Sequence, residues 1–146
     1  MPAPPEGRWL DFAPGAGQGK HMISTMVQVA LGGAAGAVLR SLTGGLALRL
    51  IGPGFPWGTL AVNVLGSFVM GALVVTLAHL GGNRFTPLLM TGLLGGFTTF
   101  SAFSLDALTL WERGEPALAG VYVLASVGLS LAAIVAGLAL MRSFWA

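Results

Sequence analysis

The sequence predicts an all-α membrane protein with four transmembrane helices, and three observations support this fold class. Of the 146 residues, 55% are hydrophobic and only 8% are charged, whereas roughly 25% of an ordinary soluble domain is charged. The charged residues leave three long charge-free windows, at 50–83, 85–105 and 116–141. A fourth apolar stretch, 22–48, is interrupted only by Arg40. Each stretch is long enough to cross hydrocarbon, which takes about 20 apolar residues.

The N-terminal 25 residues differ from the rest of the chain. Prolines, glycines and charged residues alternate there without an apolar period, which predicts a disordered leader or an expression remnant over 1–25. A secretory signal over the first apolar stretch is the alternative, but Arg40 and a continuing helical pattern argue against it. Residues 26–146 then form a single four-helix transmembrane domain.

The four spans are expected at 26–50, 57–80, 86–111 and 116–143. Helix-breaking residues separate them: Pro53, Gly54 and Pro56 precede the second span, and Gly114 and Pro116 precede the fourth. Thr86 followed by Pro87 predicts an N-cap and first helical position for the third span. Trp57, Trp111 and Trp145 fall near span ends, as in an aromatic belt.

The loop charges do not select an orientation. Without the leader, one side of the membrane carries Arg84 and Arg142, and the other carries Arg49 and Arg113. The positive-inside rule therefore predicts no preferred orientation, because it depends on an excess of Lys and Arg on one side of the membrane. A chain that inserts both ways can form an antiparallel, dual-topology homodimer, although Arg8 and Lys20 break the balance if the leader is native.

The first span repeats Gly32, Gly36, Arg40 and Gly44 at intervals of four, so these residues share one helix face. Small residues on such a face allow a neighbouring backbone to approach closely, which predicts a packing face. A charge at membrane depth is costly and faces a partner or water. Arg40 therefore either extends to the nearer interface or lines an anion-attracting vestibule.

The second span contains GTLAVNVLGSF, in which Thr59, Asn63 and Ser67 form one polar face. A buried Asn amide either donates to a partly dehydrated anion or joins helices by hydrogen bonds. The fourth span has a similar stripe of Tyr122, Ser126 and Ser130. These hydroxyls form either a ladder of donors along a pore or interhelical hydrogen bonds.

The third span holds the densest signal, GGFTTFSAFS at 95–104. Paired glycines and β-branched threonines disfavour regular helix, so we expect a break near the middle of this span. Irregular backbone at membrane depth is tolerated only inside protein or beside a cavity, and its freed carbonyls can bind a cation. Phe100 and Phe103 share a face just downstream. Their positive ring edges suit an anion, although such a pair is also typical of core packing.

Other function classes find no support in the sequence. Seven basic residues are scattered without a cluster, which argues against a nucleic-acid partner. The absence of cysteine excludes disulfides and Cys-ligated metals. No nucleophile with a matching base is apparent, so an enzyme is not expected.

Taken together, GGAAGAVLR at 32–40, GTLAVNVLGSF at 58–68 and GGFTTFSAFS at 95–104 resemble the Fluc (CrcB-like) fluoride channels over about residues 26–143. The resemblance implies a passive, fluoride-selective channel of a bacterial plasma or inner membrane that exports cytoplasmic fluoride. It also implies an antiparallel homodimer with a structural sodium ion at the dimer interface. The resemblance implies that the backbone carbonyls of Gly95 and Thr98 bind the sodium ion.

The resemblance further implies a fluoride path and a vestibule. The path residues carried over by position are Asn63, Thr99, Phe100, Ser101, Phe103, Tyr122, Ser126 and Ser130. Arg40 and Asp106 match the vestibule residues. Asp106 departs from the family, which usually has Glu at this position, so the charge is kept with a shorter reach.

Two rival functions remain at the level of sequence. A small dual-topology multidrug transporter needs a carboxylate embedded in the membrane, but the first span has none and Asp106 lies near a span end. A non-transporting assembly subunit needs only the glycine faces, and it leaves the aligned hydroxyls unexplained.

Overall fold

The computed structural model describes residues 16–81 and 83–146, and these residues form a bundle of helices. In chain order the elements are α1 (Ala16–Ile51), α2 (Trp57–His79), the 3-10 turn η2 (Asn83–Phe85), the π-helix η3 (Pro87–Leu94), α3 (Gly95–Phe97), α4 (Phe100–Glu112) and α5 (Pro116–Trp145). Four stretches are long and apolar enough to cross a membrane, at His21–Ile51, Trp57–His79, Pro87–Glu112 and Pro116–Trp145. The four-helix prediction is therefore confirmed, and the chain is a multi-pass membrane protein.

Helix α1 begins at Ala16, ahead of the start expected at Met26. The sequence explains the extension, because no proline occurs between Pro14 and Pro53 to interrupt backbone hydrogen bonding. The remaining part of the expected leader, 1–15, lies outside the described residues.

The ends of the other spans fall close to the expected positions. Gly52 and Gly114 adopt positive φ values of 97° and 80° in the loops after α1 and α4, a conformation that glycine tolerates. Thr86 precedes η3 and Pro87 occupies its first turn, as expected. Thr86 has helical dihedrals, however, and its side chain makes no capping hydrogen bond, because the 3-10 turn η2 leads directly into η3.

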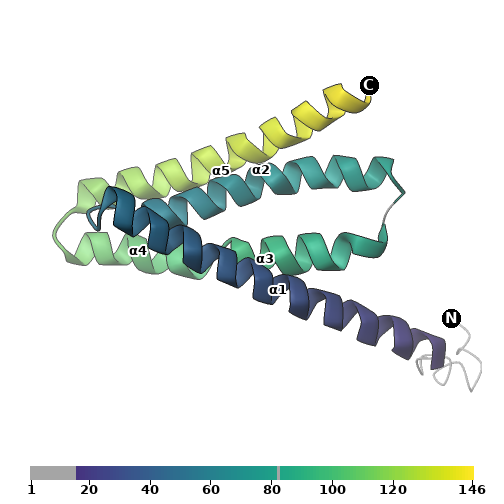
Figure 1. Ribbon diagram of the computed structural model, residues 1–146. Coiled ribbons are helices and arrows are strands. Elements are labelled where there is room, and N and C mark those ends of the chain that lie inside the picture. Colours follow the sequence, from purple (N-terminus) through teal and green to yellow (C-terminus); the bar gives the residue numbers. More distant parts are fainter. Residues whose placement is uncertain (1–15, 82) are drawn as a thin grey trace, which may run out of the picture.

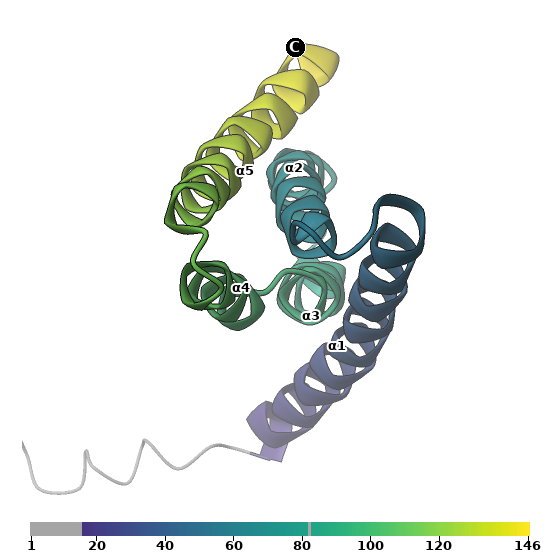
Figure 2. The ribbon, with the colours of Figure 1, turned by 90° about the vertical axis from the view of Figure 1, so that its left-hand side faces the viewer.

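Helix α2 occupies the centre of the bundle (Figure 2). It packs most extensively against α5, while α1 crosses obliquely and contacts η3 and α3 (Figure 1). Glycines create both contacts. A Cβ on Gly71 would collide with the carbonyl of Ile134 in α5, and a Cβ on Gly137 would collide with that of Phe68 in α2. The helices therefore approach as closely as backbone atoms permit.

The packing face predicted for the first span is confirmed at Gly32 and Gly36. A Cβ on Gly32 would collide with the carbonyl of Leu88, and a Cβ on Gly36 with that of Leu93. A Cβ on Gly44 would meet nothing within 4 Å, so the face does not pack within the chain at this position. The backbone of Gly44 is instead approached by the start of α2, where a Cβ on Gly58 would lie 2.8 Å from the Gly44 Cα.

Two extended residues separate α3 from α4. Thr98 has φ −79° and ψ 156°, and Thr99 has φ −154° and ψ 120°. The course of the third span bends only mildly across them (Figure 1).

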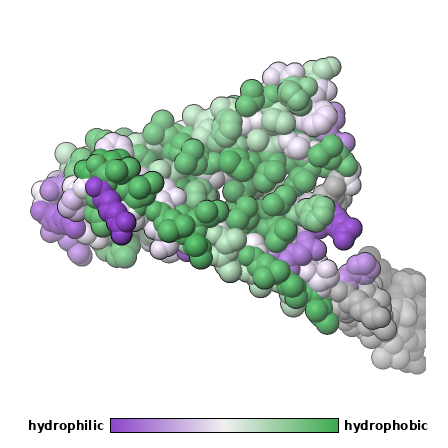
Figure 3. Space-filling model, in the orientation of Figure 1, coloured by the Kyte–Doolittle hydropathy of each residue, from purple (hydrophilic) through white to green (hydrophobic). Residues whose placement is uncertain are grey.

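Most of the molecular surface is apolar. Large Leu, Val and Phe side chains are exposed along every span, and polar residues gather towards the two ends (Figure 3). The small buried core lies towards one end, where Leu60, Phe103, Leu110, Ala119 and Tyr122 pack together. Exposed apolar side chains are stable in contact with lipid or with another protein chain, and not with water.

Candidate functional site

A cavity of about 310 Å³ lies between α2, the 98–103 segment and α5. It brings together residues that the sequence analysis selected separately on three spans. Its polar and aromatic lining includes Asn63, Ser67, Thr98, Thr99, Phe100, Phe103, Ser126 and Ser130. We refer to it as the central cavity.

Asn63 holds the extended segment in place. Its Nδ2 donates to the Thr99 carbonyl at 3.0 Å, and its Oδ1 accepts from the Thr99 amide at 2.8 Å. The side chain therefore satisfies the Thr99 amide, which the interruption leaves without a helical partner, and adds a bond to the Thr99 carbonyl at the start of α4. Of the two roles considered for Asn63, the structure displays the helix-joining one, and the second Nδ2 proton remains for another acceptor.

Thr99 is also the N-cap residue of α4. Its Oγ1 accepts from the Ala102 amide at 3.2 Å, as an N-cap residue does, and lies 3.3 Å from the Ser101 Oγ. The threonine that interrupts the third span thus restarts the helix that carries Phe100 and Phe103.

Arg40 reaches the same segment from α1. Its Nη1 lies 3.5 Å from the Thr98 carbonyl oxygen, in hydrogen-bonding geometry, and the residue is half-buried. The structure therefore places Arg40 inside the bundle and not extended to an interface. Asp106 lies elsewhere, in a second cavity near the end of α4, so the two expected vestibule residues are not brought together.

Aromatic rings form a row beside the central cavity. The Phe100 and Phe103 ring centroids are 5.4 Å apart at an interplanar angle of 46°, and Phe103 lies 5.5 Å from Tyr122. Phe103 is 9% exposed and Phe100 is 78% exposed. Phe103 is therefore a core residue that lines the cavity, whereas one side of Phe100 faces lipid or another chain.

Two serines of α5 carry buried hydroxyls without partners. Within the described residues, the Oγ atoms of Ser126 and Ser130 are buried and make no hydrogen bond, although both residues line the central cavity. A buried polar atom left unpaired costs about 1–3 kcal/mol. This cost fits a wall that binds a polar species, because a packing face would have paired them.

Tyr122 lies at the end of this stripe, with its hydroxyl near Ser126 and Thr59. Its ring is fully buried, and its hydroxyl donates to Asp106 Oδ2 at 3.2 Å. Tyr122 thus continues the polar row past Ser126 and connects it to the second cavity.

The carbonyl of Gly95 is a candidate cation ligand. The Thr99 amide, which would bond to it in a regular helix, bonds to Asn63 instead, and Gly95 is exposed. The Thr98 carbonyl is partly engaged by Arg40, but a carbonyl oxygen has two lone pairs. Neutral carbonyl oxygens are suitable ligands for a hard monovalent cation.

Sequence reasoning missed some residues of these sites. The polar face of the second span is divided, with Thr59 in the second cavity and Ser67 in the central one. Arg113 lines the second cavity although it was counted only as a loop charge. Gln28 in α1 has a buried Oε1 without a partner among the described residues. Gln28 lies four residues before Gly32, on the same helix face, and this spacing could have identified Gln28 from the sequence.

Comparison with known proteins decides the family. Residues 27–138 match the family described as "CrcB-like protein, Camphor Resistance (CrcB)". The chain belongs to the CrcB-like family. A protein of Cereibacter sphaeroides named "Fluoride-specific ion channel FluC" is 64% identical over 125 residues, which are 86% of this chain and 100% of that protein. Proteins of the same name from Rhizobium etli and Paracoccus denitrificans are 60% and 58% identical, over 79% and 86% of this chain and 94% and 100% of their own lengths.

Proposed function

We propose that this CrcB-like chain is a passive, fluoride-selective ion channel that exports fluoride from the cytoplasm. The observation that carries the proposal is the central cavity, which Ser126 and Ser130, with unpaired hydroxyls, line together with Phe100 and Phe103. The fluoride-channel relatives, at 58–64% identity, support the same ion.

The lining suits a small, strongly hydrated anion. Hydroxyl donors and positive ring edges replace part of the water that fluoride loses on leaving solution. Asn63 keeps the 98–99 segment in register and has one amide proton free to donate. A larger anion such as chloride would bind the same donors less strongly and would need a wider path.

The driving force needs no fuel. Fluoride enters cells as neutral HF and ionises in the less acidic cytoplasm. A membrane potential that is negative inside then favours anion exit by about 2.3 kcal/mol per 100 mV. A channel therefore suffices, and no catalytic residue is required.

We further propose that the channel is an antiparallel homodimer. The arginines of the loops, which are balanced when Arg8 and Lys20 are not counted, and the long apolar faces support this assembly. The Gly95 and Thr98 carbonyls of both subunits would hold one structural sodium ion at the dimer interface. The two extended residues at 98–99 support this site, because the Thr99 amide bonds to Asn63 and leaves the Gly95 carbonyl available.

Ion efflux from liposomes tests the channel. Purified protein in liposomes that contain potassium fluoride, with sodium present on both sides, should release fluoride when valinomycin carries the counter-ion, and it should release chloride negligibly. Equal leakage of fluoride and chloride, or no leakage of either ion, would contradict the proposal. Replacing sodium on both sides with N-methylglucamine should lower fluoride flux and the thermal stability of the dimer, and an unchanged dimer would argue against the sodium site.

Labelling tests the orientation. The chain has no cysteine, so a single cysteine placed at exposed Glu115 is the only thiol. An impermeant reagent added to intact cells should modify only part of the protein, and the remainder should react once the membrane is opened. Complete modification from one side would exclude dual insertion.

A further inference from the structure

Two backbone carbonyls beside the extended residues 98–99 lack their usual helical donors. In a regular helix, the Gly95 carbonyl would accept from the Thr99 amide, and the Thr98 carbonyl would accept from the Ala102 amide. The Thr99 amide donates instead to Asn63 Oδ1, and the Ala102 amide donates to Thr99 Oγ1. Because unpaired carbonyls at membrane depth are costly, both oxygens are available to another donor or to a cation.

Arg40 supplies a donor to one of these carbonyls. Its Nη1 lies 3.5 Å from the Thr98 carbonyl oxygen. This distance is at the upper limit of a hydrogen bond, and a carbonyl oxygen has two lone pairs, so the same oxygen can also bind a cation. Among the residues that the structure describes, the Arg40 guanidinium forms no ion pair. Its positive charge is therefore not compensated by a carboxylate of this part of the chain.

Close backbone packing fixes Arg40 against this segment. Gly36 lies one turn before Arg40 on the same helix face, and a Cβ on Gly36 would lie 2.7 Å from the Phe97 amide nitrogen. A Cβ on Gly96 would lie 2.5 Å from the Gly33 carbonyl oxygen. Since α1 and the third span touch through their backbones, the position of the guanidinium follows from helix packing as well as from the side-chain conformation.

We propose that Arg40 sets the cation affinity of the carbonyl site formed by Gly95 and Thr98. Arg40 is a positioning residue that holds the Thr98 carbonyl oxygen, and its charge opposes the binding of a second cation to the same oxygen. This inference rests on the proposed sodium site and names the residue that regulates it. Removing the charge while keeping a donor should strengthen sodium binding, whereas the loss of a purely structural contact would weaken it.

The expected effect is large because both positive charges contact one oxygen atom. At an effective dielectric constant of about 20, two like charges about 6 Å apart alter an affinity by roughly a hundredfold. Relaxation of the arginine side chain lowers this effect. We therefore expect the sodium affinity to rise by about tenfold or more when the charge is removed.

Sodium-dependent thermal unfolding measures this affinity independently of fluoride flux. The purified protein in detergent is unfolded at a series of sodium concentrations, with tetramethylammonium keeping the ionic strength constant. The sodium concentration that gives half of the maximal stabilisation reports the affinity of the site. In Arg40→Gln this concentration should be about tenfold lower than in the unsubstituted protein. A uniform loss of stability in the variant does not alter this concentration.

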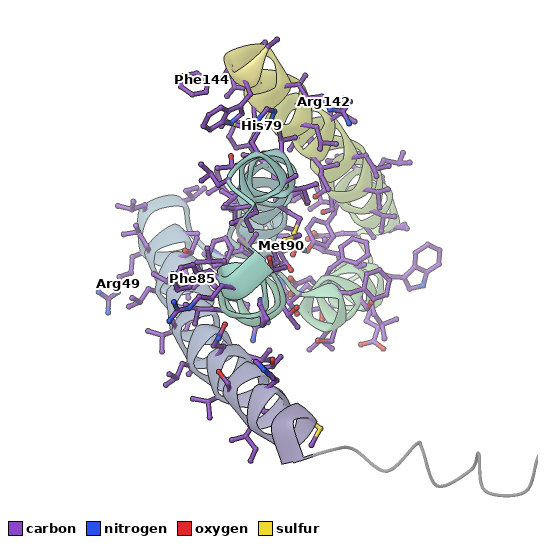
Figure 4. The ribbon with its side chains drawn as sticks, turned by 90° about the vertical axis from the view of Figure 1, so that its right-hand side faces the viewer. Arg49, His79, Phe85, Met90, Arg142 and Phe144 are labelled. Carbon is purple, nitrogen blue, oxygen red and sulfur yellow. The ribbon has the colours of Figure 1, made fainter. Side chains whose placement is uncertain are left out.

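Arg49→Gln is the matched control. Arg49 also lies on α1, and its place in the sequence puts it roughly 13 Å beyond Arg40 along the helix axis. Its side chain extends outward from the helices (Figure 4). This substitution removes the same charge from the same helix, but it should leave the half-maximal sodium concentration unchanged.

Arg40→Lys allows the charge to be removed in one folded sample. At about pH 7 this variant should resemble the unsubstituted protein in its sodium dependence. At about pH 11 the lysine loses its charge whereas arginine keeps it. Raising the pH should therefore strengthen sodium binding in Arg40→Lys more than in the unsubstituted protein, in which every other titrating group is the same.

The outcomes separate this inference from the proposed function. Unchanged or weaker sodium binding in Arg40→Gln would overturn the role of Arg40. If Arg40→Gln does not fold, equal responses of Arg40→Lys and the unsubstituted protein to pH would overturn it. An unsubstituted protein that is not stabilised by sodium would instead refute the sodium site itself, and the liposome assay would still decide the channel function.

Discussion

Replacing Asn63 with alanine tests whether one side chain supports the interrupted third span. The substitution removes the hydrogen bonds of 3.0 Å and 2.8 Å to the Thr99 carbonyl and amide. Because Thr99 lies at membrane depth, no bulk water can replace these partners.

The magnitude follows from these two bonds. Leaving a buried backbone group unpaired costs about 1–3 kcal/mol, while hydrogen bonds measured within membranes average about 0.6 kcal/mol. We therefore expect Asn63→Ala to lower the free energy of unfolding by about 1–4 kcal/mol. Fluoride flux should fall at least tenfold, because Thr99 then no longer fixes the start of α4 and the position of Phe100.

Thermal unfolding in detergent and fluoride efflux from liposomes measure the two effects. Thr76→Val is the matched control, since Thr76 also lies on α2 but its hydroxyl bonds only to Ala72 of its own helix. The control should unfold and conduct much like the unsubstituted protein. If Asn63→Ala does the same, the reasoning from the Asn63–Thr99 contacts is refuted.

Three further predictions follow from other contacts. Phe100→Ile should abolish or strongly slow fluoride flux with little loss of stability, because Phe100 is largely exposed within one chain; unchanged flux would remove Phe100 from the path. Ser126→Ala and Ser130→Ala should each slow fluoride efflux while stability is unchanged or raised by about 1 kcal/mol, because each removes an unpaired buried hydroxyl; a loss of stability in thermal unfolding would show that these hydroxyls are paired. Gly71→Ala should destabilise by about 1–3 kcal/mol, since its Cβ meets the Ile134 carbonyl, whereas Gly128→Ala, with open space at its Cβ, should be nearly neutral in the same unfolding assay.

The sequence by itself determined the membrane class, the number of spans and most of their limits. Transfer into hydrocarbon depends on the summed hydropathy of about 20 consecutive residues, which is a local property. The glycine face at Gly32 and Gly36 was predictable for a similar reason, because helical periodicity places residues four apart on one side. The identity of the transported ion, fluoride, was inferred from the resemblance to a family and not from the periodicity of the sequence.

Only the tertiary structure decided what each polar face meets. Asn63 finds its partner 36 residues away at Thr99, and Tyr122 finds Asp106 16 residues away. These contacts depend on how the helices cross and rotate against one another, which the period of a single helix does not specify. For the same reason, the face that carries Thr59 and Ser67 divides between two cavities. Arg113, which the sequence presented as a loop charge, lies with the 52–56 connection in the lining of the second cavity.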